Sequence, residues 1–276
     1  MTVEQPVLQA RAIDEFNHVV NRLQQNDIYV CCIDNTNPET PDAVFPNNWV
    51  SFHHDGKVIL YPMMALNRQA ERNNNILEKI GETFEIKEVI DLTYFEKEHK
   101  YLEGTGSIVF DHPHKIAYAA ISPRTDPDVL KYLCERIGYR HFVFTTKIVE
   151  LPVYHTNVML NIGDKYAVVC FDAIPDIKEK NDIRRMLAFT GHDIVTISLQ
   201  QMASFVGNML QVTSHSGKSF TILSSQAIRS LHLPQINVIG NKNELLSFDI
   251  STIELAGGGG IRCMMAEIFS PLKITH

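Results

Sequence analysis

A single cysteine, Cys263, closely follows a run of four glycines at positions 257–260. Glycine lets the backbone adopt positive φ and approach a ligand closely, and a cysteine held beside backbone N–H groups can favour its thiolate. Because the thiolate is a strong nucleophile, Cys263 is a candidate for covalent catalysis. A flexible turn followed by a buried packing cysteine is the competing interpretation, since free cysteine is among the most buried residue types.

The surroundings of this cysteine belong to an internal repeat. Five segments share a polar or glycine-rich break next to strand-like apolar stretches, and they recur roughly every 50 to 60 residues. Their reference positions are Asn48, Gly106, Asn157, Asn208 and Arg262. Helix-like apolar patterns lie between the breaks, at residues 65–80, 127–137, 177–187 and 224–231.

This periodicity predicts an α/β fold made of ββαβ-type repeats. One such unit cannot bury both faces of its small sheet, so the copies must pack around a common axis. We therefore expect a five-bladed, pseudo-symmetric α/β propeller that forms a single domain over residues 1–276. Polar side chains at the breaks should then meet near one centre. They are Asn47, Asn48, Glu103, His155, Asn157, Asn208 and Cys263.

The composition is that of an ordinary globular protein, with 45% hydrophobic and 21% charged residues. A net charge of −7 without a Lys/Arg cluster argues against nucleic acid or an anionic membrane as a partner. No apolar run approaches the roughly 20 residues of a membrane span, and the N-terminus lacks a signal-peptide pattern. A cytoplasmic protein is expected, and homo-oligomer formation is left open.

The remaining four cysteines are expected to be reduced packing residues, because the total of five is odd and their spacing is irregular. Cys31 and Cys32 should point to opposite faces of a strand, and Cys134 and Cys170 should lie in the core.

The twelve histidines do not indicate a metal site. The chain has no Cys-x-x-Cys pair and no His-Glu-x-x-His helix, so we predict no metal and no cofactor. The pair His53-His54 and the turn His112-Pro113-His114 are expected in surface loops.

Three motifs, in the second, third and fifth repeats, resemble the pentein superfamily of arginine deiminases, dimethylarginine hydrolases, agmatine deiminases and amidinotransferases. They are Leu102-Glu103-Gly104-Thr105-Gly106, His155-Thr156-Asn157 and the glycine run before Cys263. The segments at 45–51, 121–126 and 205–211 look most like the bacterial branch that includes citrulline-utilisation hydrolases. The resemblance covers essentially the whole chain.

The resemblance implies a C–N hydrolase with a covalent cysteine intermediate and no cofactor. Cys263 would attack the central carbon of a guanidino or ureido group. His155 would protonate the departing amine and then deprotonate the incoming water. Glu103 would bind the substrate's N–H groups and hold the planar carbon in line with the sulfur. The expected partner is a small molecule, citrulline or an arginine derivative.

Four positions depart from the pattern of the guanidine-handling relatives, which place carboxylates there. These positions are Gly106, Asn157, Asn47 and Asn48. A guanidinium in a closed site needs anionic partners, whereas a neutral ureido group needs both donors and acceptors, which amide side chains supply. The resemblance thus favours citrulline, cleaved to ornithine, carbon dioxide and ammonia, unless Asp34, Asp42 or another nearby carboxylate supplies the missing charge.

Two further residues have alternative interpretations. Arg124 is the candidate to pair with a substrate α-carboxylate through its planar fork, or it is a solvated arginine at a strand end. Trp49 lines the pocket or belongs to the core.

Other functions stay open at this point. An arginine or methylarginine deiminase-type hydrolase and an amidinotransferase use the same residues, although the compact chain favours hydrolysis. The same propeller also occurs in a ribosome-binding translation factor without catalysis, so the fold alone does not establish an enzyme. The presence of cysteine, histidine and glutamate at matching repeat positions favours catalysis.

Overall fold

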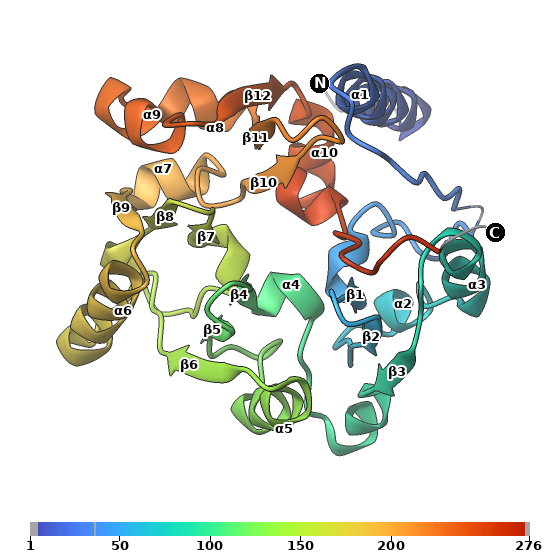
Figure 1. Cartoon of the computed structure of the whole chain (residues 1–276), viewed down its shortest axis with the longest axis horizontal. Helices are drawn as coiled ribbons and strands as arrows, with labels where there is room; N and C mark the ends of the chain where they lie inside the picture. Colours follow the sequence, from blue (N-terminus) through green and yellow to red (C-terminus); the bar gives the residue numbers. More distant parts are fainter. Residues whose placement is uncertain (1–4, 36, 274–276) are drawn as a thin grey trace. The chain divides into compact units, whose positions relative to one another are not determined.

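The computed structural model describes residues 5–35 and 37–273, and its strands form small repeated sheets (Figure 1). Within those ranges there are four three-stranded sheets, with orders β1-β2-β3, β4-β5-β6, β7-β8-β9 and β10-β11-β12. The strands are β1 (Val50–Phe52), β2 (Lys57–Leu60), β3 (Glu88–Asp91), β4 (Val109–Asp111), β5 (Ile116–Ala120), β6 (Arg140–Phe144), β7 (Leu160–Ile162), β8 (Tyr166–Val169), β9 (Asp193–Thr196), β10 (Leu210–Thr213), β11 (Ser219–Ser224) and β12 (Glu244–Phe248).

Each sheet has the same topology, which confirms the predicted ββαβ repeat. The first two strands pair antiparallel, and a helical crossover returns the chain to a third strand that pairs parallel with the second. The α-helices are α1 (Gln5–Gln25), α2 (Leu66–Gln69), α3 (Asn74–Thr83), α4 (Gly104–Ser107), α5 (Pro127–Ile137), α6 (Ile177–Phe189), α7 (Leu199–Ala203), α8 (Ser225–Ser230), α9 (Leu233–Ile239) and α10 (Ser251–Gly257). The 3₁₀ turns are η1 (Pro46–Asn48), η2 (Thr93–Glu98), η3 (Thr156–Val158), η4 (Phe171–Ala173) and η5 (Ile261–Met264).

The predicted breaks are short helical turns, since η1, α4, η3 and η5 coincide with four of the five, and the segment around Asn208 is a hydrogen-bonded turn. The chain after the fifth break takes a different path. Within the described residues, η5 leads to no three-stranded sheet of its own. Instead Ile268 forms a parallel bridge with Phe52, and Leu272 forms an antiparallel bridge with Phe84.

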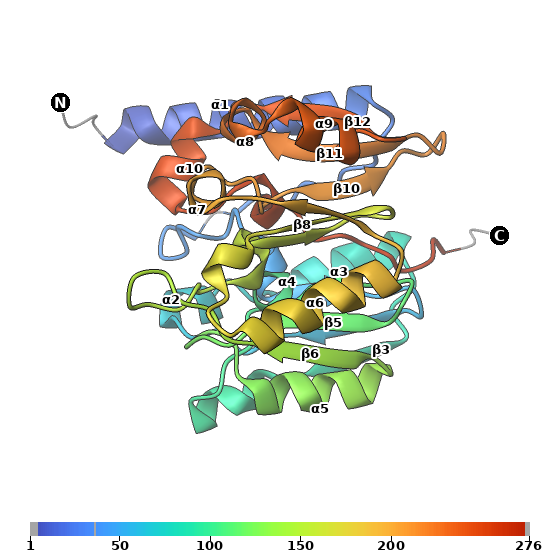
Figure 2. The ribbon, with the colours of Figure 1, turned by 90° about the vertical axis from the view of Figure 1, so that its left-hand side faces the viewer.

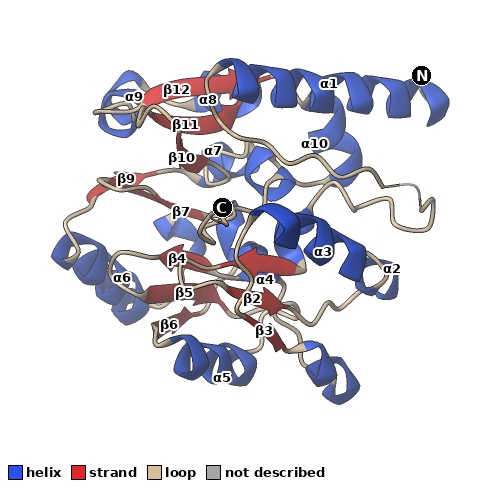
Figure 3. Ribbon diagram, turned by 45° about the vertical axis from the view of Figure 1, so that its right-hand side comes forward, coloured by secondary structure: helices blue, strands red, loops and turns tan. Residues whose placement is uncertain are grey.

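The chain divides into two compact units. The first comprises Met1–Cys32 and Val158–Arg262, and the second comprises Ile33–Asn157 and Cys263–His276. The expectation of a single domain over 1–276 stays a prediction. In the first unit, α1 lies beside α10 (Figure 3), and the carboxylate of Glu15 accepts hydrogen bonds from the Thr252 and Ile253 amides.

The second unit contains two of the sheets. Helix α4 connects them, because it contacts η1 and β1 of one sheet and β4 of the other. Helix α5 packs along β6 (Figure 2), and its apolar face joins the core under β5. Trp49 is 3% exposed and packs with Val50 and Phe52, which confirms the core interpretation of this residue.

Helix α5 matches its predicted bounds because the sequence caps it at both ends. The Asp126 side chain accepts the amides of Asp128 and Val129, and Pro127 occupies the first turn, where its missing N–H is not needed. Gly138 then ends the helix with φ of +73°. The predicted helices at 177–187 and 224–231 correspond to α6 and α8.

Three local expectations were wrong. The predicted helix at 65–80 is divided into α2 and α3, because the Asn73 side chain accepts the Asn75 amide and begins a new helix. Cys31 and Cys32 lie in an irregular segment, half-buried and exposed, and no named strand includes them. His53 is buried at 5% exposure, although its neighbour His54 is exposed as expected.

Cys134 and Cys170 are fully buried, as predicted, and none of the five cysteines forms a disulfide. Among the helices of the described ranges, not one combines the length and the apolar character that crossing a bilayer requires.

Candidate active site

The candidate site lies in the second unit, where four repeats present polar residues at or beside their helical turns. Gly104 begins α4 with φ of +47°, and a Cβ there would lie 2.2 Å from the Asn47 carbonyl oxygen. Only glycine accommodates both the positive φ and this close approach. The glycine therefore lets α4, which Glu103 directly precedes, pack against η1 of the first repeat.

Hydroxyl groups fix the backbone around these turns. Ser107 Oγ accepts the Glu103 amide at 3.0 Å and donates to the Arg124 carbonyl at 2.7 Å. Thr156 Oγ1 donates to the Ser107 carbonyl at 2.6 Å and accepts the Ala120 amide at 2.7 Å. The turn that carries His155 is thereby held to α4 and β5 through buried hydrogen bonds.

Glu103 is the centre of the site. Its side chain is fully buried, and Oε2 accepts the His155 Nε2–H at 2.7 Å and an Arg124 N–H at 3.0 Å. The other oxygen, Oε1, accepts the Met64 amide at 3.0 Å. A buried carboxylate with three donors is electrostatically satisfied, and it can hold an imidazole in one orientation.

The protonation states follow from these contacts. Burial by itself would raise the pKa of Glu103, but the hydrogen bond from His155, the charge of Arg124 and the Met64 amide outweigh it and lower this pKa to about 2. Burial lowers the pKa of His155, and the bond to Glu103 only partly opposes this. The imidazole is therefore neutral at rest, with its proton on Nε2 and its Nδ1 able to accept one.

Cys263 lies in η5 and is 6% exposed. The Asn157 amide nitrogen donates to its Sγ at 3.5 Å, and the thiol approaches Asn157 Oδ1 at 3.9 Å. Tyr154 lies beside the imidazole and is 44% exposed. Its ring lies 4.9 Å from the His155 ring.

The asparagine pair of the first repeat is also buried here, with Asn47 at 0% and Asn48 at 2% exposure. Asn47 Nδ2 donates to Thr105 Oγ1 at 3.2 Å. A Cβ on Gly106 would lie 2.3 Å from Asn48 Nδ2 and 2.9 Å from His155 Nδ1. The Asn48 amide and the imidazole thus converge on the space beside Gly106.

The structure brings the eight predicted residues into the second unit, although their roles stay predictions. Arg124, expected to bind a substrate carboxylate, donates to Glu103 and lies 5.9 Å from the centroid of the Tyr154 ring. Asn208 belongs to the first unit, where its Oδ1 accepts the Arg262 amide at 3.0 Å, immediately before Cys263 in sequence.

Sequence reasoning missed a buried ion pair, Arg68 with Glu71, that contacts Asn48 of η1. Arg68 donates to Glu71 through Nε at 2.8 Å and Nη2 at 2.9 Å, and its Nη1 donates to Asn48 Oδ1 at 2.6 Å. The spacing Arg-x-x-Glu in a helical pattern was the available signal, but it is usual on exposed helix faces.

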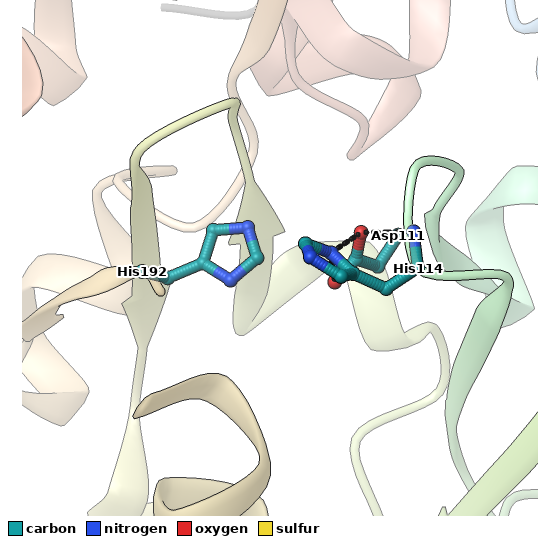
Figure 4. Close-up of side chains that lie close together, drawn as sticks. All are labelled: Asp111, His114 and His192. Carbon is teal, nitrogen blue, oxygen red and sulfur yellow. Dashed lines mark hydrogen bonds and ion pairs between the residues drawn. The ribbon is translucent and has the colours of Figure 1, made fainter. Parts of the chain in front are cut away.

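A histidine outside this site also pairs with a carboxylate. His114 Nδ1 lies 2.8 Å and 3.0 Å from the two oxygens of Asp111 (Figure 4). His192, drawn in the same figure, belongs to the first unit, where its Nδ1 lies 2.9 Å from Thr190 Oγ1. That the chain binds no metal stays a prediction.

Comparison with solved structures supports the same fold. The N-terminal domain of ArgZ with bound substrate, an arginine dihydrolase from the ornithine-ammonia cycle in Cyanobacteria, is 15% identical with a TM-score of 0.75, over 95% of this chain and 88% of that one. AgrE in complex with ornithine and NAD⁺ is 18% identical with a TM-score of 0.74, over 99% of this chain but 38% of AgrE. A dimethylarginine dimethylaminohydrolase adduct with S-methyl-L-thiocitrulline is 16% identical with a TM-score of 0.68, over 96% and 89%.

These likenesses and the repeated ββαβ sheets define an α/β protein of the pentein fold. The family model described as N,N dimethylarginine dimethylhydrolase, eukaryotic, matches residues 1–270, and the chain belongs to this family. A comparison with curated proteins gave no match. The more specific resemblance to citrulline-utilisation hydrolases stays a prediction.

Proposed function

We propose that the chain is a cysteine-dependent hydrolase that cleaves a C–N bond at the planar terminal carbon of an arginine-like amino acid. The observation that carries the proposal is the buried Glu103 carboxylate, which orients His155 while the Asn157 amide contacts the thiol of Cys263. Nucleophile, proton carrier and orienting carboxylate come from three separate repeats of one unit, which packing alone does not require.

The proposed reaction has two halves. The Cys263 thiol gives its proton to His155, and the sulfur bonds to the substrate carbon. His155 then passes that proton to the departing nitrogen as the C–N bond breaks, which leaves a carbamoyl group (from a ureido substrate) or an amidino group (from a guanidino substrate) on the sulfur. In the second half His155 takes a proton from water, the resulting hydroxide attacks the same carbon, the C–S bond breaks, and the proton returns to the sulfur.

Citrulline is the favoured substrate in this proposal. Its thiocarbamoyl intermediate would be hydrolysed to a carbamate that loses carbon dioxide, so that citrulline and water give ornithine, ammonia and carbon dioxide. Both buried carboxylates near Asn48 are already paired, Glu103 with Arg124 and Glu71 with Arg68. A guanidinium would add a cation without a dedicated partner, whereas a neutral ureido group would not.

A guanidino substrate is the second candidate, and two observations favour it. The family description names N,N-dimethylarginine, and ArgZ is described as an arginine dihydrolase. In addition, Asp42 lies close enough to contribute to the raised pKa of Glu71, for which burial is the largest cause. Asp42 is half-buried and is a candidate for the cation's partner.

The direct test is to incubate the purified protein with citrulline, arginine and N,N-dimethylarginine and to measure ornithine, ammonia, citrulline and dimethylamine. We expect citrulline to be consumed fastest. Cys263→Ser should lose nearly all turnover because a hydroxyl is a far poorer nucleophile at neutral pH. Cys31→Ser, outside the site and half-buried, is the matched control and should retain full activity.

Asn157→Asp tests the charge argument within the same assay. A carboxylate beside Cys263 should shift kcat/KM toward arginine by about tenfold, because it favours a cation and repels the ureido oxygen. Preference of the wild-type protein for arginine, with citrulline accumulating, would establish the guanidino alternative. Transfer of the amidino group to an added amine would indicate an amidinotransferase. Binding without turnover would support the interpretation of the chain as a non-catalytic binding propeller.

A further inference from the structure

The Asn48 amide can face the site in only one of its two orientations. A guanidinium donates hydrogen bonds and accepts none, so the atom of Asn48 that meets Arg68 Nη1 at 2.6 Å must be the carbonyl oxygen, Oδ1. The nitrogen, Nδ2, then points the other way. The flip of an asparagine side chain, usually ambiguous, is here decided by its partner.

The Asn48 nitrogen faces the proton carrier of the proposed reaction. Nδ2 is buried and has no hydrogen-bond partner among the described residues. It lies within 2.3 Å of the point where a Gly106 Cβ would stand, and His155 Nδ1 lies within 2.9 Å of that same point. In the proposed reaction, a substrate group that reaches His155 Nδ1 would therefore lie close to the Asn48 N–H₂.

Arg68 itself cannot change its position easily. It is 5% exposed, and besides Glu71 it donates to the Phe45 carbonyl at 3.0 Å. Because the Glu71 carboxylate balances the charge of Arg68, the pair orients the Asn48 amide but adds little net charge to the site. Freed from this pair, the amide could rotate and present Oδ1, an acceptor that suits the N–H groups of a guanidinium.

We infer that Arg68, held by Glu71, is a positioning residue that locks the Asn48 amide with its N–H₂ toward the substrate, and so selects a ureido oxygen over a guanidinium. The inference rests on the proposed function and deepens it, because it identifies how this site distinguishes the two substrate classes. Arg68 acts through Asn48 and does not touch the substrate.

The test is the ratio of kcat/KM for citrulline to that for arginine in an Arg68→Met/Glu71→Met double variant. Replacing both partners avoids an unpaired buried charge, which a single substitution would leave. We expect the ratio to fall at least tenfold. In an Asn48→Ala background the same double change should leave the ratio within about twofold, because the residue through which Arg68 acts is gone.

The matched control is Arg72→Met/Glu96→Met, which removes another partly buried ion pair of the second unit. It should leave the ratio unchanged even if stability falls. An unchanged ratio in the Arg68/Glu71 variant, an equal fall in the Asn48→Ala background, or an equal fall in the control would overturn the inference.

A second variant and a binding measurement cover the cases in which the methionine pair does not fold or the wild type is inactive. If the methionine pair does not fold, Arg68→Gln/Glu71→Gln replaces it, since a glutamine at 68 can accept as well as donate and no longer dictates the flip. If the wild type turns over neither substrate, the proposed function fails, and calorimetric affinities of citrulline and arginine for Cys263→Ser proteins supply the same ratio. Binding of neither ligand would refute both proposals.

Discussion

Replacing Glu103 by glutamine keeps the shape of the side chain but removes its charge. Burial disfavours the carboxylate, yet the His155 hydrogen bond and the Arg124 charge lower the pKa of Glu103 from 4.5 to about 2. That difference corresponds to about 3 kcal/mol in favour of the charged form in the folded protein. Since glutamine resembles the protonated acid, Glu103→Gln should lower the free energy of unfolding at pH 7 by about the same amount.

The sign of the pH dependence follows from the lowered pKa. The contribution of Glu103 is fully present above pH 4.5 and is lost as the pH falls toward 2, where the wild-type carboxylate takes up its proton. The unfolding free energies of wild type and Glu103→Gln, measured by urea denaturation, should therefore converge between those values. Hydrolysis should fall at least about a hundredfold at pH 7, because His155 loses the carboxylate that orients it.

Glu96→Gln is the matched control for this experiment. Glu96 also accepts a backbone amide, that of Met63 at 2.8 Å, and an arginine, Arg72 at 3.0 Å, but no imidazole of residues 5–35 and 37–273 donates to it. We expect a loss of stability with activity retained. A stability loss for Glu103→Gln below about 1 kcal/mol, or one that persists undiminished near pH 3, would refute the electrostatic reasoning.

Two further predictions concern neighbouring residues. Burial lowers the pKa of His53 from 6.5 to about 4. The contribution of its neutral form to stability is therefore complete above pH 6.5, and about 3 kcal/mol should be lost as the pH falls to 4. In urea titrations His53→Gln should reduce this loss of stability between pH 6.5 and 4, whereas the exposed His54→Gln should not. Gly106→Ala would place a methyl group 2.3 Å from Asn48 Nδ2, so we expect a loss of about 1–3 kcal/mol in stability and at least tenfold in kcat/KM. Gly81→Ala, whose Cβ would make an ordinary 3.5 Å contact, should retain activity. Equal effects of the two substitutions would contradict the steric argument.

The repeat architecture could be predicted from the sequence because local residue patterns indicate it. Each break carries polar or glycine residues before an apolar strand, and this recurs in every unit, so the topology of the four sheets follows without long-range information. The same periodicity placed Glu103, His155 and Asn157 at equivalent turns. Helix α5 was predicted to the residue since its caps, Asp126 and Gly138, are local signals.

Residues whose environment depends on distant neighbours were not predictable in this way. His53 is buried because Phe110 and Tyr139 from the next repeat pack around its ring, which no local pattern indicates. Cys31 and Cys32 lie in an apolar run typical of a strand, but none of the described segments pairs with that run as a strand. Strand formation needs a pairing partner, and the sequence of one segment does not supply it.

The sequence by itself determined the residue types and their positions at the breaks: a cysteine, a histidine, a glutamate and amides in place of carboxylates. Only the tertiary structure decided how they are paired. Arg124 contacts Glu103, and Arg68 fixes the orientation of Asn48, although their partners lie some 20 residues away along the chain. The packing of the repeats determines side-chain direction and burial. In the low-dielectric interior these contacts decide which side chains are charged and which atoms donate or accept hydrogen bonds.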